Sequence, residues 1–148
     1  MIKNTAQKHM FRISQNDIRY GNYDTVFVSL PFTDDFSFAG VWPDPKLWAD
    51  NFAFVNVDYA KNPLTIGVAT LDVLDEKGDL YEDAGPYQFD ADKLTSQPIR
   101  LDSLLSPLYR AITRSDSLYL SFCFQPQGRG AMPSKKDSLV LEFHSPIE

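Results

Sequence analysis

The fold is decided by Ser117-Leu118-Tyr119-Leu120-Ser121-Phe122-Cys123-Phe124-Gln125. Every second residue in this stretch is a leucine or a phenylalanine, which predicts a β-strand with one buried face. A second alternation runs over residues 138–144, with Leu139, Leu141 and Phe143 facing inward. A Gly-rich link of about ten residues predicts that the two strands are antiparallel neighbours, although a link of that length also permits a crossing to another sheet.

Earlier segments extend this β pattern. Residues 25–30 are β-branched and aromatic and end at Pro31, which predicts a first strand. Further short strands are predicted within 52–57, 66–71 and 96–101. On the third of these four strands, Gly67 lets a neighbouring backbone approach closely. We therefore expect an all-β, antiparallel sandwich.

Two segments depart from the strand pattern. Ser106 and Pro107 suit the cap and first residue of a helix, which predicts one short helix near 106–113. Residues 72–92 form a long loop rich in Asp and Glu, whose default interpretation is a solvated acidic loop, with a loose calcium site as the alternative. The spacing of its acids does not fit an EF-hand, because Lys77 stands where a ligand belongs.

Composition restricts the class of protein. The chain has 148 residues, 43% hydrophobic and 23% charged, which is ordinary for a globular domain. A net charge of −6 argues against binding to nucleic acid or to anionic lipid. No apolar run approaches the ~20 residues needed to span a bilayer, so no membrane insertion is expected. The polar residues 1–24 are interpreted as a leader or irregular arm without the apolar stretch of a signal peptide, and residues 25–148 as the sandwich module.

Several segments together resemble the opening half of a known module: 30–37 (LPFTDDFS), 43–48 (PDPKLW), 66–72 (IGVATLD), 94–99 (LTSQPI) and 116–122 (DSLYLSF), the last continuing to 125–128 (QPQG). They resemble the MAM-like or concanavalin-like jelly roll of large secreted bacterial proteins associated with type IX secretion or gliding motility. The resemblance spans roughly residues 25–144. It implies an extracellular or cell-surface location. It also implies a protein or glycan partner at that surface.

In that family the strand matching 138–144 is followed by further strands, the last of them rich in aspartate. We count about six or seven candidate strands here, whereas jelly rolls use about eight or more. The sequence therefore predicts an incomplete sandwich, completed by the remainder of the same polypeptide.

Acidic residues suggest a calcium site. Asp34 and Asp35 are paired carboxylates on a loop, and such oxygens are ligands that calcium prefers. The resemblance implies that an aspartate near the first strand joins acids of the closing strand. Asp72, at the end of the 66–71 strand, is a candidate third ligand. The alternative is that Asp34 and Asp35 only shape a turn.

Aromatic residues suggest a ligand surface. Trp42, Trp48 and Tyr87 lie in loops among acids and prolines, where exposed rings could stack on sugars. The alternative is that the two tryptophans cap the open end of the core, because large rings bury much apolar area.

No pattern in the sequence predicts catalysis. It lacks a Gly-x-Ser-x-Gly motif, a phosphate-binding loop, a His-Glu-x-x-His motif and a cysteine pair. Glu142 and His144 alternate outward on their strand, and the lone Cys123 is expected to be a small buried hydrophobe. The leading hypothesis is a non-catalytic binding or structural module. A carbohydrate-binding module of a glycan-degrading enzyme and a fragment of a concanavalin-like hydrolase remain the alternatives.

Overall fold

A computed structural model describes residues 27–145 of the chain. Its first sheet pairs β1 (Phe54–Asn56) with β2 (Val68–Thr70) in antiparallel register, with Val55 opposite Ala69. Both strands lie within the segments 52–57 and 66–71 that the sequence predicted. In the connection between them Asn62, which precedes Pro63, adopts a left-handed φ of 51° that asparagine tolerates.

The second sheet is a hairpin of β3 (Ser103–Leu104) and β4 (Arg110–Ala111). The helix expected near 106–113 is therefore wrong: Arg110 and Ala111 pair with Leu104 and Ser103, and the described residues contain no helix. A helix this short makes few internal hydrogen bonds. The hairpin instead gains a further backbone bond from Ile112 to Asp102 (2.8 Å).

Segment 95–100 is the meeting point of two other parts of the chain. Its backbone forms an antiparallel bridge between Ser96 and Trp48 and a parallel bridge between Ile99 and Val28. These are single bridges rather than continuous strands, so over the described residues 27–30 and over 96–101 the predicted strands are formed only at Val28, Ser96 and Ile99. Residues 1–24, the predicted leader or arm, lie outside the described residues.

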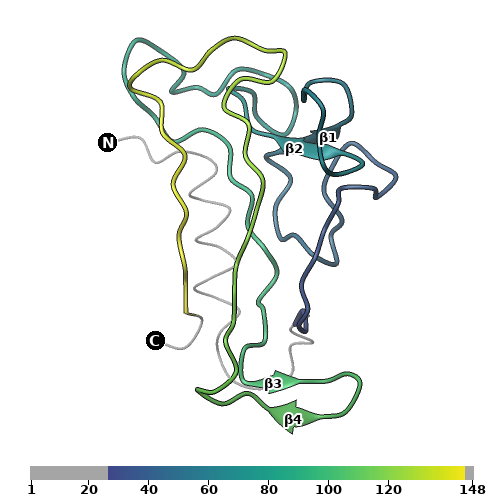
Figure 1. Cartoon of the computed structure of the whole chain (residues 1–148). Helices are drawn as coiled ribbons and strands as arrows, with labels where there is room; N and C mark the ends of the chain where they lie inside the picture. The colour runs from purple at the N-terminus through teal and green to yellow at the C-terminus, as the bar shows by residue number, and fades with distance from the viewer. Residues whose placement is uncertain (1–26, 146–148) are drawn as a thin grey trace.

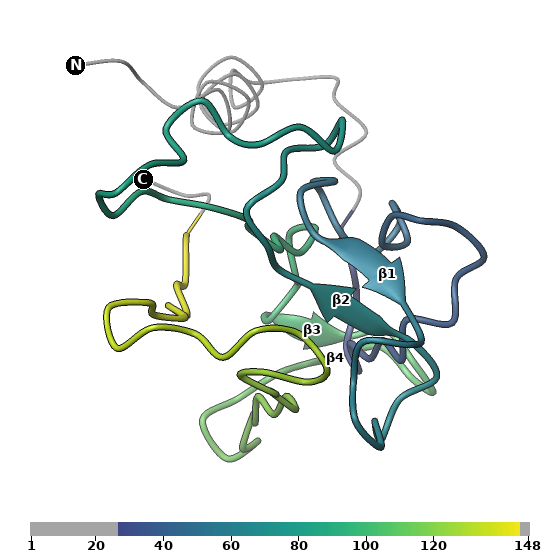
Figure 2. The same ribbon diagram turned by 90° about the horizontal axis from the view of Figure 1, so that it is seen from above.

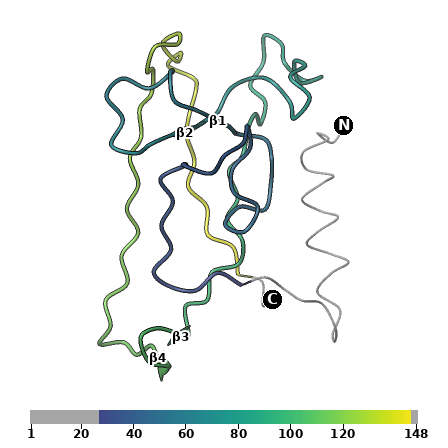
Figure 3. The same cartoon turned by 90° about the vertical axis from the view of Figure 1, so that its right-hand side faces the viewer.

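Two long stretches that carry the alternating pattern run between the ends of the molecule. Figure 1 shows 117–125 (green) rising from β4 and 138–145 (yellow) descending to the left of it, and Figure 3 shows the two traces set apart from each other. Within residues 27–145 neither stretch belongs to a strand or a bridge, and both are exposed. The predicted burial of their leucines and phenylalanines is wrong, because no described strand lies against them.

The buried core is small and lies near the first sheet. Phe52 and Ala53, just before β1, are buried together with Tyr81 and Pro43. Cys123 is exposed, so its predicted burial is also wrong. Figure 2, viewed from above, shows the loop 72–92 extending away from β2. Among the described residues no helix is long and apolar enough to cross a membrane. Residues 27–145 are thus all-β in class, with two small antiparallel sheets.

Candidate functional site

Two consecutive aspartates build the turn that forms one wall of the candidate site. The carboxylate of Asp34 accepts the backbone N–H of Phe36 (2.8 Å), and that of Asp35 accepts the N–H of Ser37 (3.1 Å). These local bonds are the ones that aspartate makes in turns, and they hold Phe36 at a φ of 53°. Hydrogen bonds from Ser37 keep the pKa of the Asp35 carboxyl below its usual value.

Trp48 ties this turn to a second loop. Its indole N–H donates to the other carboxylate oxygen of Asp34 (2.6 Å). Its ring stacks on Phe36 at 5.8 Å between centroids and meets Phe32 edge-on at 5.5 Å. The tryptophan is therefore packed against two phenylalanines.

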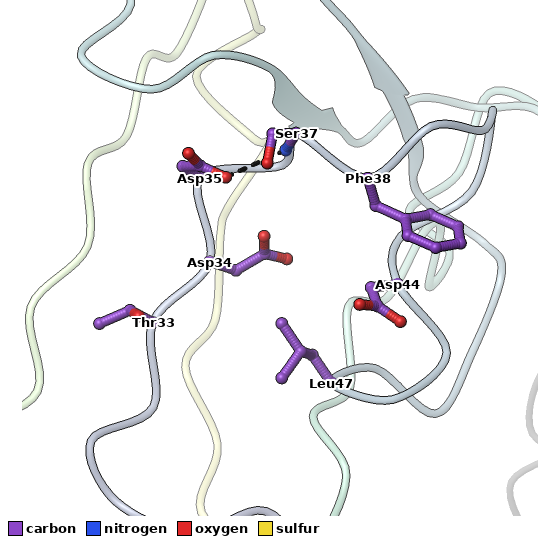
Figure 4. Close-up of a pocket in the computed structure, with 7 residues that line it drawn as sticks. All are labelled: Thr33, Asp34, Asp35, Ser37, Phe38, Asp44 and Leu47. Carbon is purple, nitrogen blue, oxygen red and sulfur yellow. Dashed lines mark hydrogen bonds between the residues drawn. The ribbon is translucent and has the colours of Figure 1, made fainter.

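The second loop is the turn around Asp44, between Pro43 and Pro45. The Asp44 carboxylate accepts the N–H of Lys46 (2.9 Å), and its carbonyl accepts the N–H groups of Leu47 and Trp48 (both 2.9 Å). This turn places Leu47 and Asp44 opposite Asp34, as Figure 4 shows.

A cavity of about 550 Å³ opens between the two turns, lined by Thr33, Asp34, Asp35, Ser37, Phe38, Asp44 and Leu47. In Figure 4 the Asp34 carboxylate and the Leu47 side chain project into this space, whereas the Asp35 carboxylate turns back to Ser37. The Phe38 ring, 45% exposed, closes one side. Carboxylates beside an exposed ring can accept hydroxyl hydrogen bonds and offer an apolar face, which suits a small polyhydroxylated ligand.

The structure separates the sequence-predicted ligand residues. Trp42 is half-buried and Trp48 is packed against its neighbours, whereas Tyr87 is 84% exposed on the acidic loop. None of the three lines the cavity at Asp34. Stacking of a sugar on these rings stays a prediction.

The predicted calcium ligands are also divided. Asp34 and Asp35 share the cavity, but Asp72 lies outside it. The carboxylate of Asp72 instead accepts the N–H of Leu74 (2.7 Å). Among residues 27–145 no group of three acidic, histidine or cysteine side chains is placed to hold a metal ion. The calcium site stays a prediction, and an unchanged melting temperature at millimolar calcium would remove it.

A second polar cluster closes the acidic loop on itself. One carboxylate oxygen of Asp92 accepts the hydroxyl of the buried Tyr81 (2.7 Å), and the other accepts the N–H of Asp72 (2.6 Å). Burial raises the pKa of Asp92 to about 6 against these hydrogen bonds. Burial, followed by the bond to Asp92, raises the pKa of Tyr81. The loop predicted to be solvated is therefore structured at its base.

Sequence reasoning missed Asp44, Phe38 and Asp92. The Pro-Asp-Pro motif signalled a turn at Asp44 but not which loop it faces. Asp92 ends the acidic loop, and the apolar Phe89 nearby is a sequence signal of some burial. In the structure the ring of Phe89 lies 6.0 Å from that of Tyr81. No local pattern marks the contact of Asp92 with Asp72, because 20 residues separate them.

Comparison of the chain with protein-family models, with curated proteins and with solved structures finds no match.

Proposed function

We propose that this chain is a non-catalytic binding or structural β-sandwich module, of jelly-roll type, in a secreted or cell-surface bacterial protein. Its partners are a protein or glycan at the cell surface and the remainder of the same polypeptide. The resemblance of the segments 30–37, 43–48 and 66–72 to the concanavalin-like module supports the location and the class of fold. The all-β structure agrees with that class.

The observation that carries the proposal is the exposure of the two alternating stretches. Leu118, Leu120, Phe122 and Phe124 are 48–60% exposed, and Leu139, Leu141 and Phe143 are exposed as well. A monomeric soluble protein seldom shows apolar side chains in such rows, and where it does they mark an interaction surface. A module that joins other β-structure would present rows of this kind.

The environment of Trp48 supports a structural role for this ring. A sugar-binding platform needs its ring face free. The ring of Trp48 instead stacks on Phe36 and meets Phe32 edge-on, and its N–H donates to Asp34. The packing of Trp48 is that of a residue which holds loops together.

Hydrogen exchange tests the proposed binding role at the stretch 139–143. We expect these amides to exchange fast in the purified chain and several-fold more slowly when the intact protein is recovered from cells with its partners. Surface labelling of intact cells with a membrane-impermeant amine reagent tests the location. Equally fast exchange in both samples, or no labelling, would contradict the proposal.

The cavity at Asp34 favours carbohydrate as a second candidate ligand, because it combines the projecting Asp34 carboxylate with the half-exposed Phe38. A glycan array probed with the purified chain tests this alternative. We expect any glycan signal to fall when Phe38 is replaced by Ala and to persist in Tyr87→Ala, whose ring lies outside the cavity. Absence of glycan binding would exclude this ligand class.

A further inference from the structure

The stretch 117–125 is held in place at both of its ends. At one end the side-chain amide of Gln125 accepts the N–H of Lys61 (2.9 Å) and donates to the carbonyl of Lys61 (2.6 Å). At the other end the Asp116 carboxylate binds the Arg110 guanidinium at 2.6 Å and the N–H and hydroxyl of Thr113 at 2.9 and 3.0 Å. The stretch therefore runs between two hydrogen-bonded ends.

Between these ends the backbone pairs with no other backbone within the described part of the chain. Residues 117–124 take part in no strand or bridge there. The leucines and phenylalanines on one side are about half exposed, and Tyr119 on the other side is 90% exposed. An extended backbone with unpaired N–H and C=O groups is complementary to another β-strand, because a strand alone satisfies such a row at every residue.

The alternation of the stretch is symmetric about Ser121, with Tyr119 corresponding to Cys123. Leu118 and Leu120 on one side of Ser121 correspond to Phe124 and Phe122 on the other, and polar Ser117 corresponds to polar Gln125. No charged residue occurs from Ser117 to Gly128. Two copies of this stretch can therefore meet without any like-charge contact, which would be unfavourable between directly opposed strands. The stretch 138–144 is not free of charged residues, since it contains Glu142.

We propose that the stretch 117–125 pairs in antiparallel with the same stretch of a second copy of the chain, centred on Ser121. In this register Leu118 lies opposite Phe124 of the other copy, Leu120 opposite Phe122, and Ser121 opposite itself. Antiparallel pairing of one stretch with its own copy generates a two-fold symmetric interface. The hydrogen bonds at Asp116 and Gln125 hold the backbone extended before pairing, so less conformational entropy is lost when the second copy binds. The inference rests on the proposed binding role and names its partner.

Disulfide trapping tests the register. In Ser121→Cys combined with Cys123→Ser, the two new thiols face each other, with Cβ atoms about 4.5–5.5 Å apart across the pair. The matched control is Ser117→Cys with Cys123→Ser, which lies on the same side of the stretch. Its two copies would be separated by roughly 27 Å along the strands. We expect the Ser121→Cys variant to form an interchain disulfide several-fold faster under mild oxidation than the control.

A charge exchange at positions 120 and 122 tests the opposed pairs, with trapping at position 121 as the measurement. In the Ser121→Cys, Cys123→Ser background, Leu120→Lys places two lysines on diagonal positions of the interface and should slow trapping. Adding Phe122→Glu places a glutamate opposite each lysine and should restore it. Far-UV circular dichroism checks that each variant keeps the fold of the parent chain.

The self-pairing is overturned if Ser121→Cys is trapped no faster than Ser117→Cys. It is also overturned if adding Phe122→Glu to Leu120→Lys does not restore the rate of trapping. A purified chain that stays monomeric by light scattering at the trapping concentration also overturns it. Those results would leave the proposed binding role intact if the amides 139–143 are still protected in the recovered assembly. The two proposals therefore fail separately.

Discussion

Trp48 and Asp34 are joined by a hydrogen bond of 2.6 Å between the indole N–H and a carboxylate oxygen. The two residues are 14 positions apart, on separate turns. The other oxygen of Asp34 accepts the N–H of Phe36 (2.8 Å), on which the Trp48 ring stacks. One carboxylate thus fixes both a turn and the ring packed over it, and the walls of the candidate cavity depend on it.

Removal of this carboxylate should loosen the cavity. Asp34→Ala leaves the partly buried Trp48 N–H without its acceptor, which we expect to lower the unfolding free energy by about 1–3 kcal/mol. Urea unfolding followed by tryptophan fluorescence measures the change. Asp34→Asn, which keeps an acceptor oxygen, should cost less. An equal loss in Asp34→Ala and in the neighbouring Asp35→Ala would contradict the role given to Asp34.

Gly67 should not tolerate a side chain. A Cβ at this position would collide with the carbonyl oxygen of Phe36 and lie 3.1 Å from a methyl of Val55, while the Gly67 N–H donates to Asp35 (3.0 Å). We expect Gly67→Ala to lower the melting temperature clearly, because β2 must move away from the 34–37 turn. Gly85→Ala is the matched control, since its nearest neighbour lies at 3.8 Å. Equal melting temperatures for the two variants would show that Gly67 does not lie in close contact with Phe36 and Val55.

Stability should depend on pH through Asp92. Its pKa is raised from 3.8 to about 6 in the folded chain, mainly by burial, so the folded state binds the proton more tightly than the unfolded state. The stabilising contribution of this group is present at low pH and is lost as pH rises from about 4 through about 6. Thermal unfolding across this range measures it.

Asp92→Asn should flatten this part of the pH profile, because the amide does not titrate. Asp83→Asn, on an exposed position of the same loop, is the control and should keep the profile of the parent chain. Parent and Asp92→Asn profiles with the same slope over this pH range would contradict the burial of Asp92.

Asp50 should be destabilising when ionised. One oxygen of Asp50 accepts the N–H of Thr95 (2.8 Å), and the other is buried with no hydrogen-bond partner among residues 27–145. Burial raises the pKa of the Asp50 carboxyl. We expect Asp50→Asn to raise the melting temperature at neutral pH, where it removes a poorly solvated charge. Well below the ordinary pKa of 3.8 the two chains should unfold alike, since both are then neutral. A lower melting temperature at neutral pH would show that the charge is stabilising.

The short-range features of the fold were accessible from the sequence. β1 and β2 lie inside predicted strands, and the turns at Asn62 and at Asp34–Asp35 follow from residues that stabilise turns by themselves. The helix at 106–113 was not accessible in this way. Its capping residues are a local preference, and the pairing of Arg110–Ala111 with Ser103–Leu104 overrode it.

In the candidate site, too, only the features that depend on neighbouring residues were predictable from the sequence. Asp34 and Asp35 were identified as a turn or an ion site because they are adjacent, and the structure forms the turn. Asp44, Phe38 and Leu47 join them only through the contact of two loops, for which no local pattern exists.

The sequence by itself determined which residues alternate and which bend the chain, because these are properties of neighbouring residues. Only the tertiary structure decided which backbones pair and which side chains are buried. Ser117 to Gln125 has the strongest strand pattern in the chain, yet no described strand lies against it. A strand pattern specifies a face to be covered, and the position of other strands in space decides whether it is covered.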